Sequence, residues 1–390
     1  MTAPSMNERE RVLAVLRHQL PDRVPWVARL ELWYNARVAT GTLPERFRGW
    51  SLWDIDRELG IGVRLLAEVV KLETDGFETL TTTRGDETFT EYITPICTVT
   101  SRQVYNEIMR VSGVTAPYLT EHIIKRPEDY DIAEYIFEHT RPVPCYENFQ
   151  KIADQIGGDG FVLGGKIECP YQHWLLRLTG YETAFAHLHD CTERTERFLR
   201  ALTDWTREVY RVMLDSPAEV ILSGDNFDGT ITHPKLFRRY CVPFFQEFTS
   251  ELHKRGKWLA SHIDGEPSPL LQVFTESGID IAESFTPAPM TRAPLTEAQR
   301  IWGDRMLIWG GIPSVILCPS TADKDFERFA DDLFSNAVPS GNLILGVGDN
   351  IVADAILDRV IRISQLVRER GNYGMERGQS FTSPTPRQGG

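Results

Sequence analysis

Cysteine is scarce in this sequence, and long apolar runs are missing. The six cysteines lie far apart and form no Cys-x-x-Cys pair, which excludes a zinc ribbon or a disulfide framework and is typical of reduced thiols. Nowhere do about 18 uncharged apolar residues follow one another, so no membrane span is expected. The first residues show no apolar stretch behind basic ones, so no signal peptide is expected. These absences predict a cytoplasmic globular protein.

Positive charge is also in deficit. The chain has 42 Lys and Arg against 55 Asp and Glu, a net charge of −13. An acidic surface repels phosphate backbones, so we expect a small-molecule substrate and no nucleic-acid partner. The 390 residues, 42% hydrophobic and 25% charged, are enough to bury a core without disulfides or a structural metal. The sequence gives no indication of the oligomeric state.

A regular alternation of strand and helix patterns begins at about residue 159. Short apolar runs end in glycine or a polar cluster, and an amphipathic helical stretch follows them. The runs are 160–168, 218–226, 257–265, 278–285, 305–313 and 342–350. Such alternation is typical of a parallel sheet with right-handed crossovers. With strands also expected at 24–30 and 61–70, the count is about eight, which favours a (β/α)₈ TIM barrel over an open doubly wound sheet. No GxGxxG opens a helix after the first strand, so a dinucleotide fold has little support.

The N-terminal part of the chain has a different sequence pattern. Asn7-Glu8-Arg9-Glu10 has the spacing of a capping box and predicts a helix that ends before Pro21. Thr-rich alternation over about 72–116 predicts an antiparallel β insertion or lid. We expect residues 1–373 to form one barrel domain that includes this helical and antiparallel-β insertion. The polar residues 374–390 are expected to be a disordered tail.

Polar side chains gather where the predicted strands end, which is where (β/α)₈ enzymes place their catalytic groups. These positions hold Glu168, Cys169, Asp225, Asn226, His262, Asp264, Glu283, Asp349 and Asn350. His262 and Asp264 are two residues apart, so on a strand they face the same way. Crowded carboxylates repel one another unless a metal, a proton or a cationic substrate neutralises them. This crowding is the strongest functional signal in the sequence.

Ordinary structural roles are open to several of these residues. Asp225 and Asp349 could cap the helices that follow them, and Glu168 could pair with Arg177. Cys169 has no evident partner base and is expected to be a small buried side chain. Other side chains beyond the strand ends are expected to form the wall of a substrate pocket, with ordinary packing as the alternative. They are Trp33, Tyr34, Tyr171, His173, Phe227 and, as a polar member, Glu283.

Several ordered motifs resemble the uroporphyrinogen decarboxylase superfamily. They are NERERVLAVLRHQLPDRVPW (7–26), IIKRPEDYD (123–131), HPKLFRRYCVPFFQEFTSELHKRGKWLASHIDG (233–265), ESGIDIAESF (276–285), LIWGGIPS (307–314) and LILGVGDN (343–350). The resemblance covers about residues 7–371 and implies a (β/α)₈ barrel. It is closer to the branch of methylcobalamin:coenzyme M methyltransferases and related corrinoid-dependent enzymes than to true uroporphyrinogen decarboxylase.

The resemblance to this branch implies a zinc ion held by His-x-Cys and a later Cys. Here His262 matches the histidine, Asp264 stands at the first cysteine, and Asp349 falls about where the second would be. Zinc is still the first expectation for one histidine and two carboxylates, with Mn²⁺, Mg²⁺ or no metal left open. Our hypothesis is that these three residues hold a divalent metal that binds a donor or acceptor heteroatom. Asp225 or Glu168, with Asn226, would handle a proton while the aromatic wall positions a methyl group.

Two other functions stay open. A decarboxylase of the uroporphyrinogen type needs several arginines, but RVPWVARLELWYN (23–35) offers Arg29 as the one plausible match beside acidic strand ends. A smaller decarboxylation remains possible, as does a non-catalytic binder of a small cationic ligand, for which carboxylates and aromatic faces are suitable. No DxHxxG motif occurs, so any corrinoid is expected to be free or to arrive on a separate corrinoid protein.

Overall fold

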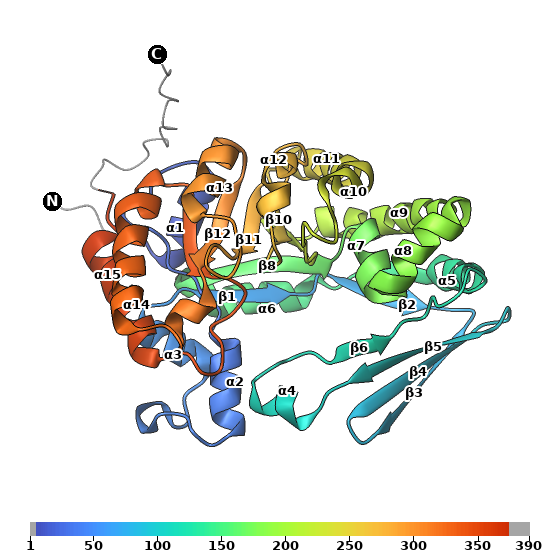
Figure 1. Ribbon diagram of the computed structural model, residues 1–390, viewed down its shortest axis with the longest axis horizontal. Helices are drawn as coiled ribbons and strands as arrows, with labels where there is room; N and C mark the ends of the chain where they lie inside the picture. Colours follow the sequence, from blue (N-terminus) through green and yellow to red (C-terminus); the bar gives the residue numbers. More distant parts are fainter. Residues whose placement is uncertain (1–4, 374–390) are drawn as a thin grey trace, which may run out of the picture.

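A parallel sheet of seven strands forms the centre of the computed structural model, which describes residues 5–373 (Figure 1). The strands lie in the sheet in chain order: β1 (Val63–Ala67), β8 (Gly160–Ile167), β9 (Val220–Ser223), β10 (Trp258–His262), β11 (Ile281–Phe285), β12 (Leu307–Ile312) and β13 (Leu343–Val347). This confirms the predicted α/β class and all seven apolar runs predicted as strands from residue 61 onward. The predicted tail at 374–390 lies outside the described residues.

The segment 24–30 was predicted to be a further strand, and this prediction is wrong. A single isolated bridge occurs there, between Trp26 and Leu345, and Arg23 just before the segment forms another with Asn372. Pro25 has no N–H to donate, which prevents a continuous ladder. The segment still lies between the two edges of the curled sheet. Val27 N donates to Leu345 O on β13 (2.8 Å), and Gly62 N, just before β1, donates to Trp26 O (2.7 Å).

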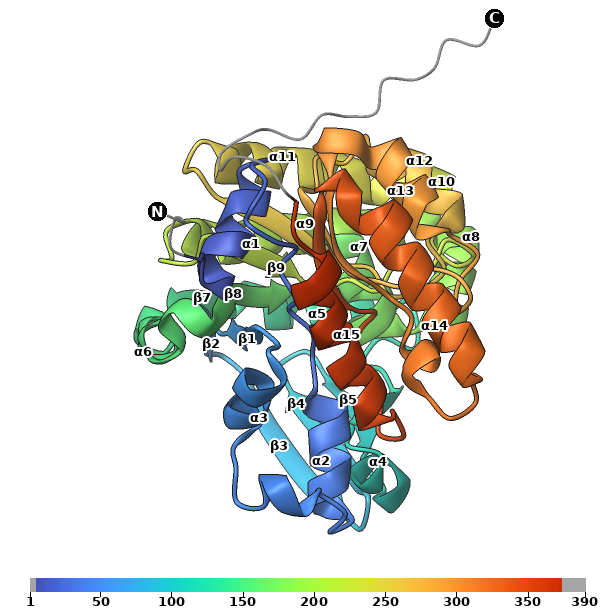
Figure 2. The same cartoon turned by 90° about the vertical axis from the view of Figure 1, so that its left-hand side faces the viewer.

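Helices surround the sheet. They are α1 (Glu8–Leu16), α2 (Glu31–Ala39), α3 (Leu52–Leu59), α4 (Glu107–Val111), α5 (Asp129–Glu138), α6 (Tyr146–Ile156), α7 (Pro170–His173), α8 (Tyr181–Asp190), α9 (Thr192–Leu214), α10 (Pro234–Leu236), α11 (Val242–His253), α12 (Leu271–Phe274), α13 (Leu295–Trp302), α14 (Asp323–Asp332) and α15 (Leu357–Arg370). Figure 2 shows α1, α3 and the C-terminal helix α15 on the same side of the molecule. Within residues 5–373, no helix combines the length and apolarity needed to span a membrane.

Helix α1 closes one end of the space that the curled sheet encloses. The predicted capping box starts it, because Asn7 Oδ1 accepts from Glu10 N (2.9 Å) and Glu10 Oε2 accepts from Asn7 N (2.8 Å). Its apolar face packs into a cluster with alternate residues of the strands. This cluster contains Val12, Val15, Leu16, Val27, Phe161, Leu163, Val220, Leu222, Ala260, Ile281, Leu307, Trp309 and Ile344. The opposite end, where the seven strands reach their carboxyl ends, is called the mouth below.

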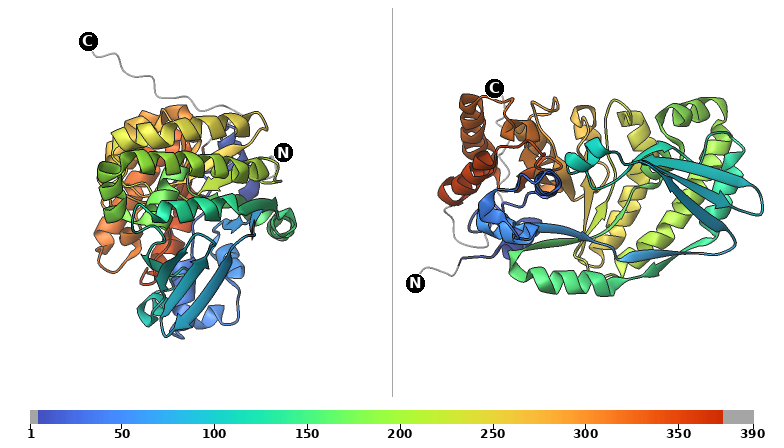
Figure 3. Two further views of the ribbon diagram at one scale, coloured as in Figure 1. Left: turned by 90° about the vertical axis from the view of Figure 1, so that its right-hand side faces the viewer. Right: turned by 90° about the horizontal axis from the view of Figure 1, so that it is seen from below.

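The predicted antiparallel insertion is present and runs further along the chain than 72–116. Strands β3 (Glu78–Arg84), β4 (Glu87–Ile93), β5 (Thr98–Val104) and β6 (Tyr118–Glu121) form a four-stranded sheet. A two-stranded pair, β2 (Val70–Thr74) with β7 (Thr140–Pro144), lies at its base. Figures 1 and 3 show the four-stranded sheet as a layer of its own beside the parallel sheet. Its last strand, β6, contributes to the site described below.

The contact between segment 24–30 and β13 can be tested at Gly346. A Cβ at this position would lie 2.9 Å from Val27 O and 3.4 Å from the ring of Trp309. Because Trp309 Nε1 also donates to Val27 O (3.0 Å), the carbonyl is held on two sides. We expect Gly346→Ala to lower the free energy of unfolding by about 1–3 kcal/mol, the usual cost of overpacking. Urea unfolding followed by tryptophan fluorescence measures this change. An unchanged midpoint would contradict the prediction, because it would show that segment 24–30 shifts to accommodate the added Cβ at no cost.

Candidate metal centre

The candidate site lies at the mouth, where polar side chains follow five of the seven strands. His262 ends β10 and Glu283 is the middle residue of β11, while Glu168, Asp225 and Asp349 come just after β8, β9 and β13. Parallel strands present their carboxyl ends at the same edge, so residues far apart in the sequence become neighbours there.

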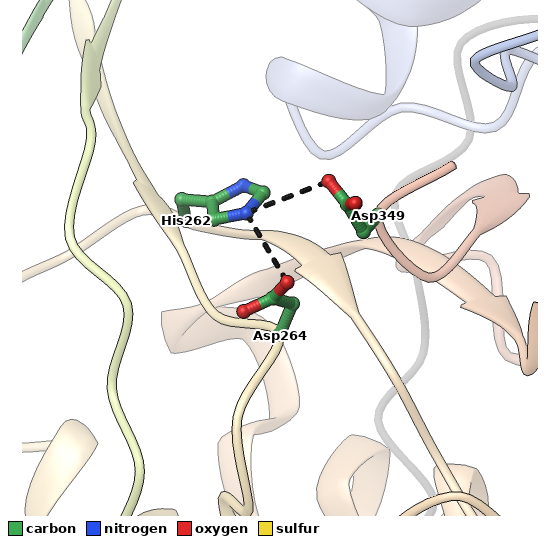
Figure 4. Close-up of side chains that lie close together, drawn as sticks. All are labelled: His262, Asp264 and Asp349. Carbon is green, nitrogen blue, oxygen red and sulfur yellow. Dashed lines mark ion pairs between the residues drawn. The ribbon is translucent and has the colours of Figure 1, made fainter. Parts of the chain in front are cut away.

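The three predicted metal ligands, His262, Asp264 and Asp349, lie together and are called the triad below (Figure 4). His262 Nε2 is 3.7 Å from Asp264 Oδ2 and 3.7 Å from Asp349 Oδ1. One potential ligand atom from each residue lies within 4.8 Å of the other two. The side chains are 18%, 26% and 42% exposed in that order, so a cation and a further ligand can reach them.

The donor set of the triad fits a divalent cation. Zinc binds histidine nitrogen and carboxylate oxygen at about 2.0–2.2 Å, so donors around a tetrahedral ion stand roughly 3.4 Å apart. The two distances from His262 Nε2, 3.7 Å each, are close to this value, and the three ligand atoms lie within 4.8 Å of one another. Three protein ligands leave the fourth position to water or substrate, as in catalytic rather than structural zinc sites. The same oxygen-rich set also suits Mn²⁺ or Mg²⁺.

Backbone strain accompanies this arrangement. Asp349 has φ 55° and Ser284, next to Glu283, has φ 61°. Positive φ is uncommon for residues other than glycine and costs free energy, and such strain clusters at functional sites. Figure 4 shows the Asp349 carboxylate pointing at His262, so the strained turn accompanies the closest approach of these two side chains.

Carboxylates hold His262 in its charged form. Burial alone would lower the pKa of His262, but Glu283 and Asp264 outweigh burial and raise it to about 10. The imidazole therefore carries protons on both nitrogens near neutral pH. A metal binds at Nε2 only in place of the proton there, since a metal ligand must be deprotonated.

Glu283, which was predicted to bind substrate, is occupied by protein partners instead. Its Oε2 accepts a hydrogen bond from His262 Nδ1 at 2.6 Å, and its Oε1 accepts from Arg64 Nη2 at 2.8 Å. The side chain is 2% exposed. Burial would raise the pKa of Glu283, but Arg64 and His262 hold it well below its usual range. Both carboxylate oxygens are thus engaged away from the open side of the site.

The two predicted catalytic residues after β9 lie side by side with different surroundings. Asp225 is fully buried; its Oδ1 accepts from Cys169 N at 2.8 Å and its Oδ2 accepts from Ser261 Oγ at 3.1 Å. Burial raises the pKa of Asp225 to about 6 despite these hydrogen bonds. Asn226 is exposed. Asp225 can therefore exchange a proton near neutral pH, while Asn226 offers an amide to a ligand.

Glu168, the other candidate for proton transfer, forms the predicted pair with Arg177. Its Oε1 accepts from Arg177 Nε at 2.8 Å, and its Oε2 lies 3.3 Å from His173 Nδ1. Burial would raise the pKa of Glu168, but His173 and Arg177 lower it to about 2. A carboxylate that stays ionised at every physiological pH is a poor proton donor. Of the two candidates, Asp225 is the one suited to carry a proton.

The predicted aromatic wall is mostly core. Phe227 is fully buried and packs edge-on against Phe237 and Phe274. Tyr171 is 1% exposed and stacks on Tyr240 at 5.0 Å. The remaining members also have protein partners: Trp33 is 2% exposed on α2, Tyr34 donates from its hydroxyl to Trp50 O (3.2 Å), and His173 contacts Glu168. Ring burial in the interior accounts for Phe227, Tyr171 and Trp33, whereas Tyr34 and His173 are only partly buried.

A pocket of about 750 Å³ opens instead between the mouth and the insertion. It is lined by Pro117, Tyr118, Leu119, Thr120, His122, Leu175, Leu176, Arg177, Thr179, Gly180, Tyr181, Glu182, Thr183, Gly224, Asp225, Asn226 and His262. Three of these belong to the predicted site, and the pocket places Asp225, Asn226 and His262 along one boundary. The opposite wall comes from β6, from the π-helical segment Trp174–Thr179 and from the start of α8. The volume is ample for a small organic molecule.

Sequence reasoning missed two kinds of residue. Arg64 belongs to the strand IGVRLLA (61–67), where a lone charge in an apolar run signals a buried partner and could have singled it out. Tyr118, His122 and Tyr181 reach the pocket from the insertion and α8, and no local sequence pattern marks them.

Two comparisons with known proteins found matches. A family model described as uroporphyrinogen decarboxylase (URO-D) matches residues 91–370. A solved structure described as a methyltransferase from Methanosarcina mazei is similar over 94% of this chain and 99% of that chain, with a TM-score of 0.57 and 16% sequence identity. At this identity the likeness concerns the fold alone. No curated protein matches the chain.

The raised pKa of Asp225 predicts a pH-dependent cost to stability. Between the unfolded value of 3.8 and the folded value of about 6, the folded state holds a proton that the unfolded state has lost, so stability falls as pH rises through this window. A shift of about two units corresponds to about 3 kcal/mol. An amide does not titrate, so Asp225→Asn avoids this loss. The unfolding free energy of Asp225→Asn minus that of wild type should therefore rise by about 3 kcal/mol from pH 4 to pH 7.

Urea unfolding of both proteins at pH 4, 5.5 and 7 measures this difference. Asp228→Asn is the matched control, because hydrogen bonds from Thr230 outweigh burial and lower the pKa of Asp228. The unfolding free energy of Asp228→Asn minus that of wild type should fall, not rise, with increasing pH. A pH-independent difference for Asp225→Asn would refute the assignment of Asp225 as a proton carrier.

Proposed function

This chain belongs to the uroporphyrinogen decarboxylase family, and we propose that within it the chain is a metal-assisted methyltransferase. The proposed reaction moves a methyl group between a small methylated substrate and a corrinoid supplied from outside the chain. A solved structure with a similar fold is described as a methyltransferase, which is consistent with this choice of branch.

The observation that carries the proposal is the triad and its position. A histidine and two carboxylates from β10, the loop after it and the turn after β13 converge to within 4.8 Å beside a pocket of about 750 Å³. Two carboxylates beside a histidine nitrogen form a donor set that a divalent cation would occupy in place of the Nε2 proton. A bound divalent metal would supply Lewis-acid polarisation of a heteroatom in the methyl donor or acceptor.

The chain's own residues have separate tasks in this proposal. His262 Nε2 and the two aspartates bind the cation, and Asp225 accepts or returns a proton at a carboxylate whose pKa is about 6. Asn226 and the tyrosines of the pocket, Tyr118 and Tyr181, hold the methylated substrate against His262. The insertion covers this side of the mouth and limits the access of water.

Decarboxylation of a polycarboxylate is less well supported by the charges at the mouth. Three arginines lie there, but each is paired: Arg64 with Glu283, Arg177 with Glu168 and Arg29 with Asp349 at 2.8 Å. A substrate with many carboxylates requires cations that are free to bind it. These three pairs leave the mouth close to neutral, which suits a substrate of little charge.

Metal content tests the triad. Purified wild-type protein should contain close to one zinc or other divalent ion per chain by elemental mass spectrometry. His262→Ala and Asp264→Ala should each lose most of it with an unchanged circular dichroism spectrum, because ligands at the mouth contribute little to the core. His122→Ala is the control, since His122 lines the pocket outside the triad and should leave metal content unchanged. A wild-type protein without metal would favour a carboxylate pocket for a cationic ligand or a metal-free decarboxylase.

Methyl transfer is tested with the metal-loaded protein. Incubation with cob(I)alamin and a panel of methyl ethers, methylamines and methyl thioethers should give methylcobalamin with one donor class, visible in the cobalamin absorption spectrum. Chelation should abolish the reaction, and added zinc should restore it. Release of carbon dioxide from small acids without any cobalamin change would contradict the methyltransferase and identify a lyase.

A further inference from the structure

The His262 ring has two nitrogens, and only one of them can face the other members of the triad. We propose that Glu283 and Arg64 are positioning residues that fix this ring so that Nε2 is the atom presented to the metal. The inference rests on the proposed metal site and adds to it two residues that contact no metal.

The first support is the geometry around Nδ1. Glu283 and His262 are direct register partners on the neighbouring strands β11 and β10. Glu283 Oε2 accepts from His262 Nδ1 at 2.6 Å, whereas both carboxylates of the triad stand 3.7 Å from Nε2, beyond hydrogen-bond distance. A turned ring would lose the short bond and point Nδ1 at the aspartates. The short bond therefore selects one orientation.

The second support is the way Glu283 is itself held. Arg64 reaches it from β1, which is not a neighbour of β11 in the sheet, and donates from Nη2 to Oε1 at 2.8 Å. Arg64 is 6% exposed and Glu283 2%. A buried ion pair with both partners engaged has little freedom to rotate. The carboxylate that receives the histidine proton is thus anchored from across the mouth.

The backbone supports the same arrangement. The β11–β12 pairing shifts register between Glu283 and Phe285, at Ser284 with φ 61°. Glu283 O accepts from Ile263 N at 2.7 Å, which ties β11 to the residue between His262 and Asp264. Bulges of this kind re-aim side chains beside active sites. Second partners that orient a ligating histidine contribute about 10–100-fold to metal affinity.

The test compares zinc affinity in chelator-treated full-length protein by competition with a chromophoric chelator. In Glu283→Gln, the amide can accept from His262 only by turning its NH₂ toward the Arg64 guanidinium, donor against donor. We expect zinc to bind about 10–100-fold more weakly to this variant than to wild type. The double variant Arg64→Met with Glu283→Gln removes the opposed donor, so its affinity should recover most of that loss.

Glu168→Gln is the matched control. Glu168 is also buried, follows a strand, pairs with an arginine and contacts a histidine, but that histidine lies outside the triad. Its zinc affinity should stay within about twofold of wild type. Equal affinity in wild type and Glu283→Gln, with loss in His262→Ala, would overturn the inference and leave the proposed function standing. Wild-type protein that binds neither zinc nor another divalent ion would overturn both.

A measurement on the wild-type protein covers the case of a variant that fails to fold. Long-range ¹⁵N–¹H spectra of histidine-labelled protein report which ring nitrogen carries the hydrogen, and His262→Ala identifies the signal. With zinc bound, His262 should show a protonated Nδ1 and a metal-bound Nε2. Metal at Nδ1 would overturn the inference, since Glu283 could not then hold the proton.

Discussion

Crowding of negative charge at one edge of a parallel sheet is the constraint on which this molecule depends. The strands run in one direction, so the carboxylates that follow them all lie at the same edge of the sheet. Negative charges that lie close together raise the free energy of the folded state unless a cation or a proton offsets them. Each carboxylate at the mouth shows one such solution: an arginine at Glu168, Glu283 and Asp349, a proton at Asp225, and the His262 imidazolium near Asp264.

These solutions divide the carboxylates by their chemistry. The buried carboxylates that pair with arginine stay ionised and are held in one orientation. They can therefore hold other groups in place but are poor proton donors. Asp225 is buried without an arginine and has a pKa of about 6, so it remains titratable. Asp264 and Asp349 are the more exposed members, at 26% and 42%, so both lie within reach of a ligand, although Asp349 also has Arg29 as a partner. One edge of one sheet thus contains fixed anions, a titratable acid and the accessible carboxylates that we propose as a cation site.

The repetitive part of this structure could be predicted from the sequence, and the long-range part could not. Seven strands were predicted because each apolar run can be recognised from neighbouring residues alone. The triad was predicted because the family resemblance points to these three positions, which lie at or just beyond the ends of such runs. Segment 24–30 was misjudged because Pro25 removes a ladder donor, and Phe227 because only packing against distant rings decides whether an aromatic side chain lines a pocket. Arg64 reaches Glu283 across 219 positions, a pairing that depends on how the sheet curls.

Two structurally separate parts of the chain form the pocket beside the triad. One wall consists of strand ends that the sheet fixes, and the other comes from β6 of the antiparallel insertion and the helix after the π-helical turn. The insertion's four-stranded sheet shares no strand with the parallel one. Substitutions at Tyr118 or His122 are therefore expected to alter the shape of the pocket without disturbing the triad. Such a division lets related enzymes diverge in what they accept while they retain the same reaction, so the insertion is where selectivity can evolve.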